Sequence, residues 1–249
     1  MSIAEPRLAA TVLLIRDRSG LEVLMVERHE QAYFSSALVF PGGVVDPEDR
    51  GPDWFPLVDG AEGLDEAERA LRIAGYRELY EETGLLLADC APAGVVTPAT
   101  EQVPFVAVVE RAKARLDLAA MHRFTHWITP EAAPKRFDTH FRLCGLGTEL
   151  VAASDGRETV SVEWIRPKDA LDLGASRQRK LLFPTQMNLK LLSQASSVEE
   201  AIADSKTRAI ATVSPIMQQR PDGLYLTLPD DAGYGAGVEF YAGRGRPKP

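Results

Sequence analysis

Hydrophobic and polar positions follow two periods along this chain, and each period predicts a different kind of element. Apolar runs bounded by turn residues predict strands, whereas apolar positions three and four residues apart predict helices. The strands expected in this way cover residues 8–15, 22–27, 38–40, 124–128, 136–143 and 160–165. Helices are expected over residues 66–82, from 103 to about 118, from 167 onward, over 184–192 and over 198–207.

The strand expected over residues 136–143 alternates most regularly. Its apolar face carries Phe137, Thr139, Phe141 and Leu143, and its polar face carries Arg136, Asp138, His140 and Arg142. The three basic side chains of the polar face are candidates to contact phosphate groups, as is Arg28 after the second strand; the alternative is that they simply face water. A histidine without a partner seldom binds a metal ion, so metal ligation by His140 is not expected.

Two parts of the chain depart from this periodicity. Residues 46–66 are rich in proline, glycine and acids, which is typical of an irregular loop. The pattern after about residue 176 is mainly helical, and Ser197 with Glu200 has the spacing of a capping box. We therefore expect a main domain over residues 1–175 and a helical C-terminal extension over 176–249, packed on the same domain.

Three glutamates are clustered at the end of the helix expected over residues 66–82, in the stretch R-E-L-Y-E-E-T-G-L. On a helix of 100° per residue, Glu82 lies about 40° and Glu81 about 60° from Glu78, on either side of it. The opposite side of the helix is an apolar stripe formed by Ile73, Tyr76, Leu79 and Tyr80.

This clustering has an energetic cost. Like charges three and four residues apart on a helix repel by a few tenths of a kcal/mol per pair. Gly84 is the natural residue to end the helix, so the acids also lie near the negative end of the helix dipole. A solvated acidic face would leave these costs unbalanced, whereas a bound cation would offset them. Ligation by oxygen alone favours Mg²⁺ or Mn²⁺.

Composition and charge exclude several classes of protein. The chain has 249 residues and a formal net charge of −8, which argues against a general nucleic-acid binder. An anionic small molecule stays compatible with this charge, because a bound divalent cation inverts the local sign. Cys90 and Cys144 form neither a metal-binding spacing nor a disulfide framework, so reduced thiols in a cytoplasmic protein are expected. No apolar run approaches the roughly 18 residues that cross a bilayer.

The motif F-P-G-G at residues 40–43, followed by R-E-L-Y-E-E-T-G-L, resembles the Nudix box, G-x5-E-x7-R-E-U-x-E-E-x-G-U, where U is apolar. Gly43 matches the opening glycine, and residues 77–85 match the second half at every fixed position. The first half departs from the pattern, because Asp49 stands in place of the first glutamate and 27 residues separate it from Arg77 (77 − 49 − 1 = 27). The box at 43–85 thus contains an insertion at about 50–69, and either Asp49 or Glu48 could replace the first glutamate.

An interrupted box of this kind is similar to that of a Nudix subgroup that includes peroxisomal coenzyme A diphosphatases. The similarity extends from about Leu8 to Pro229 and includes the stretches that flank the box. Ser36 stands where a stricter signature of other coenzyme A-cleaving Nudix enzymes has glycine. The resemblance implies an α+β fold of the Nudix type, an α/β/α sandwich with a mixed sheet.

The resemblance also implies an activity, namely metal-dependent hydrolysis of a diphosphate linkage in a nucleoside diphosphate linked to a group X. Coenzyme A and acyl-coenzyme A are candidates for that substrate. Arg77 would orient a neighbouring carboxylate, and the general base would be Glu78 or Glu158, in a later loop. The implied ligands of Mg²⁺ or Mn²⁺ are Glu78, Glu81, Glu82 and the backbone carbonyl of Gly42.

The alternative function is a non-catalytic Nudix-fold module that senses a nucleotide without cleaving it. Such a module would not need all three glutamates together with their arginine, and here all four are present. The expected partner is therefore a small-molecule diphosphate substrate. Neither nucleic acid nor a membrane is expected as a partner, and a homodimer is left open.

Overall fold

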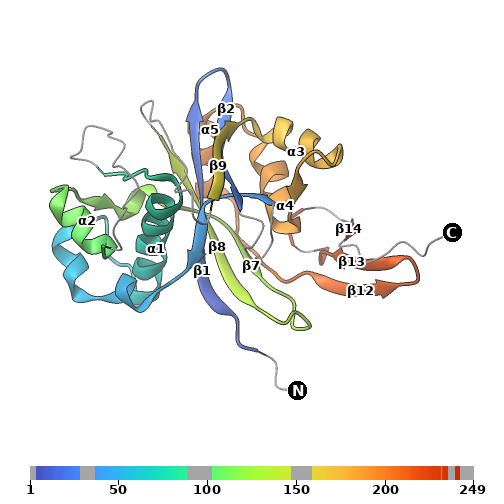
Figure 1. Ribbon diagram of the computed structural model, residues 1–249, viewed down its shortest axis with the longest axis horizontal. Helices are drawn as coiled ribbons and strands as arrows, with labels where there is room; N and C mark the ends of the chain where they lie inside the picture. Colours follow the sequence, from blue (N-terminus) through green and yellow to red (C-terminus); the bar gives the residue numbers. More distant parts are fainter. Residues whose placement is uncertain are drawn as a thin grey trace.

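The computed structural model of the chain describes residues 4–28, 37–88, 103–146, 159–230, 232–234 and 239–241, with only the backbone of 28, 159–160 and 239–241. In this part of the chain a mixed nine-stranded sheet forms the centre of the molecule. Figure 1 shows helices on both sides of it, so the expected α/β/α sandwich is confirmed. Among the described helices, none has the length and hydropathy needed to cross a membrane.

The order of the main sheet is β10-β3-β2-β1-β8-β7-β11, with β4 also paired to β1 and β9 to β2. Its strands are β1 (Arg7–Asp17), β2 (Leu21–Arg28), β3 (Ala37–Val39), β4 (Gly42–Val44), β7 (His122–Ile128), β8 (Phe137–Gly145), β9 (Thr159–Ile165), β10 (Lys180–Leu181) and β11 (Thr212–Val213). The helices are α1 (Glu66–Thr83), α2 (Phe105–Arg111), α3 (Pro167–Ala175), α4 (Phe183–Leu192) and α5 (Val198–Thr207). These bounds confirm the elements predicted from periodicity, apart from three regions.

The first two of these regions, the segment after residue 103 and the stretch over 46–66, pair with each other. The helix expected from residue 103 to about 118 ends at Arg111, and the chain continues into β6 (Leu116–Asp117) and the 3-10 helix η3 (Leu118–Ala120). The stretch expected to be an irregular loop instead contains two 3-10 helices and a short strand. They are η1 (Pro47–Arg50), η2 (Pro52–Leu57) and β5 (Val58–Asp59), and β5 pairs in parallel with β6.

The third region is the C-terminal extension, which contains strands as well as the expected helices. Strands β10 and β11 pair with β3 and β7 at the two ends of the main sheet. A separate sheet forms from β12 (Ile216–Arg220), β13 (Gly223–Thr227) and β14 (Glu239–Tyr241). Its strands β12 and β13 reach away from the main sheet in Figure 1.

Alternation along β1 and β8 divides the core into two layers. On one face, Val12 and Leu14 pack with apolar residues of α1, α2 and the inserted segment. On the other face, Leu13 and Ile15 pack with Phe141 and Leu143 of β8 and with residues of α4 and α5. The two faces of β8 therefore have the orientation that its sequence pattern predicts.

One charged side chain lies inside the α1 layer. Arg142 is 0% exposed, and its two terminal nitrogens donate to the two carboxylate oxygens of Glu68 at 2.9 and 2.7 Å. Arg72 donates to Glu68 as well. Burial alone would raise the pKa of Glu68, but these bonds from Arg142 and Arg72 hold it below its ordinary value. The pair ties the first turn of α1 to the middle of the sheet.

We predict that Arg142→Ala lowers the free energy of unfolding by about 3 kcal/mol, because it leaves a partly buried carboxylate without its main partner. The wild-type contribution is present above the ordinary glutamate pKa and is lost as the pH falls through the lowered pKa of Glu68. The control is Arg50→Ala, which removes an ion pair whose side chains are 39% and 63% exposed, for a loss below about 1 kcal/mol. Urea unfolding at neutral pH measures both, and equal losses would contradict the prediction.

Candidate active site

Local sequence signals define both ends of α1. The Asp65 carboxylate accepts a hydrogen bond from the Glu68 N–H at 2.7 Å and caps the first turn. Gly84 adopts a left-handed conformation with φ 69°, and its N–H donates to Tyr80 at the C-terminal end. The expected apolar stripe of the helix is fully or almost fully buried. The glutamates therefore occupy the last turns of a well-defined helix.

The glycine bend covers Glu78 and Glu82, whereas the side chain of Glu81 is 49% exposed. The Gly42 N–H donates to the Glu82 carboxylate at 3.1 Å, and Glu82 is only 3% exposed. A Cβ atom at residue 43 would lie 2.6 Å from Oε2 of Glu78 and closer still to Oε1. A Cβ at residue 42 would lie 2.5 Å from the carbonyl oxygen of Ala10. Both glycines are thus required by close approach, Gly43 to the Glu78 carboxylate and Gly42 to β1.

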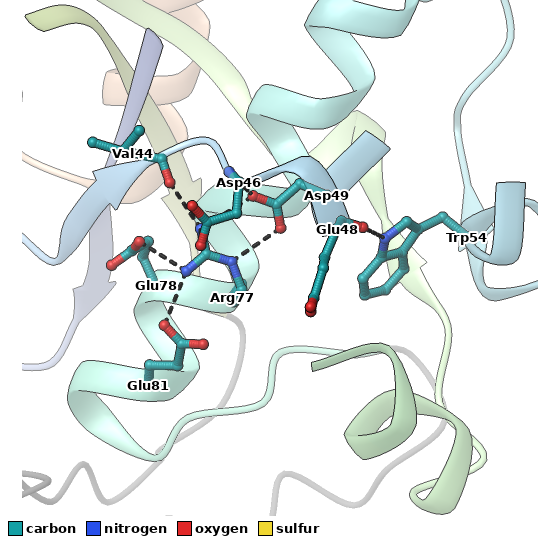
Figure 2. Close-up of polar contacts among 8 residues, drawn as sticks. All are labelled: Val44, Asp46, Glu48, Asp49, Trp54, Arg77, Glu78 and Glu81. Carbon is teal, nitrogen blue, oxygen red and sulfur yellow. Dashed lines mark hydrogen bonds and ion pairs between the residues drawn. The ribbon is translucent and has the colours of Figure 1, made fainter. Parts of the chain in front are cut away.

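Arg77 holds the group together. Each of its five N–H donors has an acceptor: two on Asp49, one each on Glu78 and Glu81, and the carbonyl oxygen of Val44 (Figure 2). The five distances lie between 2.8 and 3.1 Å. Burial by itself would lower the pKa of Arg77, but hydrogen bonding to Asp49 and the nearby acids raise it above its ordinary value. Arg77 has the contacts that an orienting role requires.

Of the two residues that could replace the first glutamate of the box, Asp49 is the one that contacts Arg77. Both of its carboxylate oxygens accept from the guanidinium, at 3.0 and 3.1 Å, and its side chain is buried. Glu48 instead contributes its backbone carbonyl, which accepts from the indole N–H of Trp54 at 2.8 Å. The Trp54 ring packs 5.6 Å from Phe105 of α2. The insertion is therefore anchored in the core and leaves Asp49 in place.

The cluster has an excess of negative charge. Among the described residues, four carboxylates contact the Arg77 guanidinium and a fifth, that of Glu82, lies beside them on the glycine bend, which gives a formal charge of −4; the four are Asp46, Asp49, Glu78 and Glu81. Burial raises the pKa of Glu81 above its ordinary value, and the charges of Asp49 and Asp46 add to the rise while Arg77 opposes it. A bound cation would offset the excess negative charge and lower the pKa of Glu81.

The donor set suits a hard divalent ion. Carboxylate and backbone oxygens are the ligands that Mg²⁺ and Mn²⁺ prefer, and such ions keep several water ligands. Glu78 and Glu81 accept from the same Arg77 nitrogen, at 2.8 and 2.9 Å, while Glu82 sits on the glycine bend. The three glutamates do not form one compact group of ligand atoms within 4.8 Å. Ligation through water or by more than one ion fits this spacing better than a closed single-ion cage.

The other predicted residues lie in three different environments. Arg142 is taken up by Glu68 inside the core, so the structure does not present it to a phosphate group and we withdraw that prediction. Arg136 donates to the backbone carbonyls of Thr129 and Ala4, near the connection between β7 and β8. Glu158 and the side chain of Arg28 lie outside the described residues.

His140 lies on the same face of the sheet as the glycine bend. Ala10 of β1 pairs with His140 on one side and with Gly43 on the other, so His140 and Gly43 are two strand spacings apart, about 10 Å. Burial lowers the pKa of His140 to about 4, and the nearby His126 adds to the effect. Sequence periodicity located His140 on the polar face of β8 but gave no sign of its neighbour on β7.

A cavity of about 370 Å³ lies near the first half of α1, away from the glutamates. Basic side chains dominate its lining: Arg72, His122, Arg123, Lys206 and Arg208. Arg72 precedes Glu82 by ten residues, about 15 Å along the helix. None of the described residues that line the cavity carries a carboxylate, so the glutamate cluster is the better candidate for metal-dependent chemistry.

A comparison of the sequence with models of protein families identifies the family of this chain. The model of the NUDT19 Nudix domain matches residues 66–190. The chain belongs to the Nudix hydrolase family. It is therefore an enzyme that hydrolyses diphosphate bonds.

Relatives with assigned names share about a quarter of their residues with this Nudix hydrolase. Acyl-coenzyme A diphosphatase NUDT19 of Gallus gallus is 27% identical, over 92% of this chain and 79% of the relative. The human and Xenopus laevis proteins of the same name are 25% and 24% identical, each over 86% of this chain, and covering 72% and 71% of the relatives. A Nudix hydrolase from Alicyclobacillus acidocaldarius has a similar structure, with a TM-score of 0.67 and 28% identity over 84% of this chain and 100% of that one.

We predict that Gly43→Ala lowers kcat by about 10²-fold or more, because the added methyl group displaces the Glu78 carboxylate by an ångström or more. The control is Gly51→Ala, where the nearest atom to the new Cβ is 3.9 Å away and φ is −63°. This variant should retain activity within about twofold. Steady-state kinetics on any cleaved substrate measures both, and a fully active Gly43→Ala enzyme would show that Glu78 does not need its observed position.

Proposed function

We propose that this enzyme hydrolyses the diphosphate linkage of coenzyme A or of acyl-coenzyme A, using Mg²⁺ or Mn²⁺. The observation that carries the proposal is the Arg77-centred carboxylate cluster beside the glycine bend, in a chain whose relatives include acyl-coenzyme A diphosphatases. Addition of water across the P–O–P linkage gives two phosphate monoesters, adenosine 3′,5′-bisphosphate and 4′-phosphopantetheine or its acyl derivative.

Each residue of the cluster has a distinct part in this proposal. Glu78, Glu81 and Glu82 would hold one or more divalent ions, directly or through water, with the carbonyl of Gly42 as a further ligand. When bound, the ion supplies charge neutralisation of the phosphate oxygens and activation of water. Arg77 keeps Glu78 and Glu81 on one side of its guanidinium, and Asp49 keeps Arg77 in place. Arg77 and Asp49 are positioning residues, since Arg77 contacts the carboxylates of Glu78 and Glu81 and Asp49 contacts the Arg77 guanidinium.

The proposed hydrolysis also needs a general base, a carboxylate that accepts a proton from the attacking water. Glu78 is the candidate within the cluster, because it lies against the backbone of Gly43 and its side chain is 13% exposed. Glu158 is the candidate from a later loop. Arg136 would contribute to phosphate binding from the residue before β8, and Arg28 from the end of β2.

A substrate panel tests the proposal directly. With Mg²⁺ or Mn²⁺, coenzyme A and acyl-coenzyme A should be cleaved with higher kcat/KM than ADP-ribose, a reduced dinucleotide or a diadenosine polyphosphate. Mass spectrometry of the products should find the two monoesters named above. Preference for another diphosphate would replace the substrate but keep the reaction, whereas binding without turnover across the panel would favour the nucleotide sensor.

We predict that Glu82→Gln reduces kcat by about 10²-fold or more, because a metal-binding charge is lost. The free energy of unfolding should stay near the wild-type value or rise, because the amide oxygen can still accept from Gly42 and one repelling charge is removed. Glu66→Gln is the matched control on the same helix, with a side chain that is 63% exposed, and should be fully active. Unchanged activity of Glu82→Gln would overturn the ligand assignment.

A further inference from the structure

A second group of potential ligands lies on the polar face of β8, outside the glutamate cluster. Asp138 and His140 are two residues apart on this strand, so their side chains leave it on the same face. His126 of β7 lies directly opposite His140 in the register of the two strands. The sheet therefore brings together two imidazoles and one carboxylate that the sequence separates by up to fourteen residues.

The contacts within this group are close. The Nε2 atom of His126 and the Nε2 atom of His140 both face Oδ1 of Asp138, the first at hydrogen-bond distance and the second at 3.4 Å. The two imidazole rings stack with centroids 4.1 Å apart and planes 21° from parallel. One ligand atom from each residue lies within 4.8 Å of the others.

We propose that His126, Asp138 and His140 form a binding site for a transition-metal dication such as Zn²⁺, distinct from the glutamate site for the hard ion. Two imidazole nitrogens with one carboxylate are a donor set that suits Zn²⁺ and its neighbours, whereas Mg²⁺ prefers oxygen alone. Three protein ligands leave a fourth position open to water.

The spacing requires only small adjustments. Metal–nitrogen and metal–oxygen distances near 2.0–2.2 Å place neighbouring ligand atoms of a tetrahedral ion about 3.3 Å apart. The contact between His140 and Asp138 already has that length. The stacked rings must tilt so that both lone pairs point to one centre, and rotation about χ2 provides this with a low barrier.

A further contact supports His126 as a ligand. Its second ring nitrogen, Nδ1, lies 2.8 Å from the hydroxyl oxygen of Thr212 in β11. Metal-bound histidines commonly donate their other N–H to such a partner, which fixes the ring and directs the free nitrogen at the metal. The side chains of His126, His140 and Asp138 are 16%, 17% and 28% exposed, so an ion could enter while losing part of its water shell.

The position of the group suggests its role. It joins β7 and β8, and through Thr212 it reaches β11, the strand between α5 and β12. A bound ion would fasten the segment after α5 to the main sheet. The ion should therefore stabilise the folded chain without being required for hydrolysis.

The test uses the full chain with millimolar Mg²⁺ present, so that the oxygen-only site is filled. Titration with Co²⁺ should then produce the intense visible absorption of a four- or five-coordinate ion with nitrogen ligands, at one ion per chain, and Zn²⁺ should abolish it. Zn²⁺ at about 100 times its Kd should raise Tm by about 5–10 °C. Thr212→Val should weaken Co²⁺ binding by about 10–100-fold.

Two histidine variants separate this site from the rest of the chain. His126→Gln should lose the Co²⁺ absorption and the Zn²⁺-dependent rise in Tm, but keep Mg²⁺-dependent hydrolysis. His122→Gln, on the same strand and outside the group, should keep all three. Absence of the band in the wild-type chain, or an unchanged band in His126→Gln, would overturn the proposal and leave His126 as a hydrogen-bonding partner of Asp138 and Thr212. Neither result depends on which diphosphate is cleaved.

Discussion

The arrangement of the active site depends on the bonds of a single guanidinium. Arg77 is buried, and its five N–H donors are all used, so its orientation is fixed by Asp49 and Val44 on one side and by Glu78 and Glu81 on the other. One positive charge cannot balance the four carboxylates that contact it together with the Glu82 carboxylate on the glycine bend, which makes the cluster attractive to a further cation. The same side chain thus orders the acids and leaves their charge largely uncompensated.

This arrangement explains how the Nudix box tolerates a long insertion. The buried carboxylate that the first half of the box delivers to Arg77 is that of Asp49, which comes from η1. The residues that follow leave the cluster at once and are fixed elsewhere, by Trp54 against Phe105 and by the pairing of β5 with β6. An insertion attached to its own part of the core can vary in length without moving Asp49.

The sequence predicted those features that depend on local periodicity and on the Nudix resemblance. The face of α1, the alternation of β8 and the ends of α5 follow from positions close together in the chain. The sequence did not predict contacts that depend on strand register or on burial. Arg142 has the pattern of a surface residue on a polar strand face, and only the packing of α1 across that face buries it against Glu68. The short elements of the insertion depend in the same way on partners far along the chain.

The second ligand group, His126, Asp138 and His140, could not be predicted from the sequence for the same reason. His140 has no partner within the sequence pattern, because its partner is supplied by the register of β7 against β8. Two donor sets with different chemistry consequently lie on one side of the sheet, an oxygen-only cluster where α1 meets β4 and an imidazole–carboxylate group on β7 and β8. Because Mg²⁺ and Zn²⁺ differ in their preferred ligands, both sites could be filled in one chain without competing for the same ion. Only the ion in the glutamate cluster would then take part in hydrolysis.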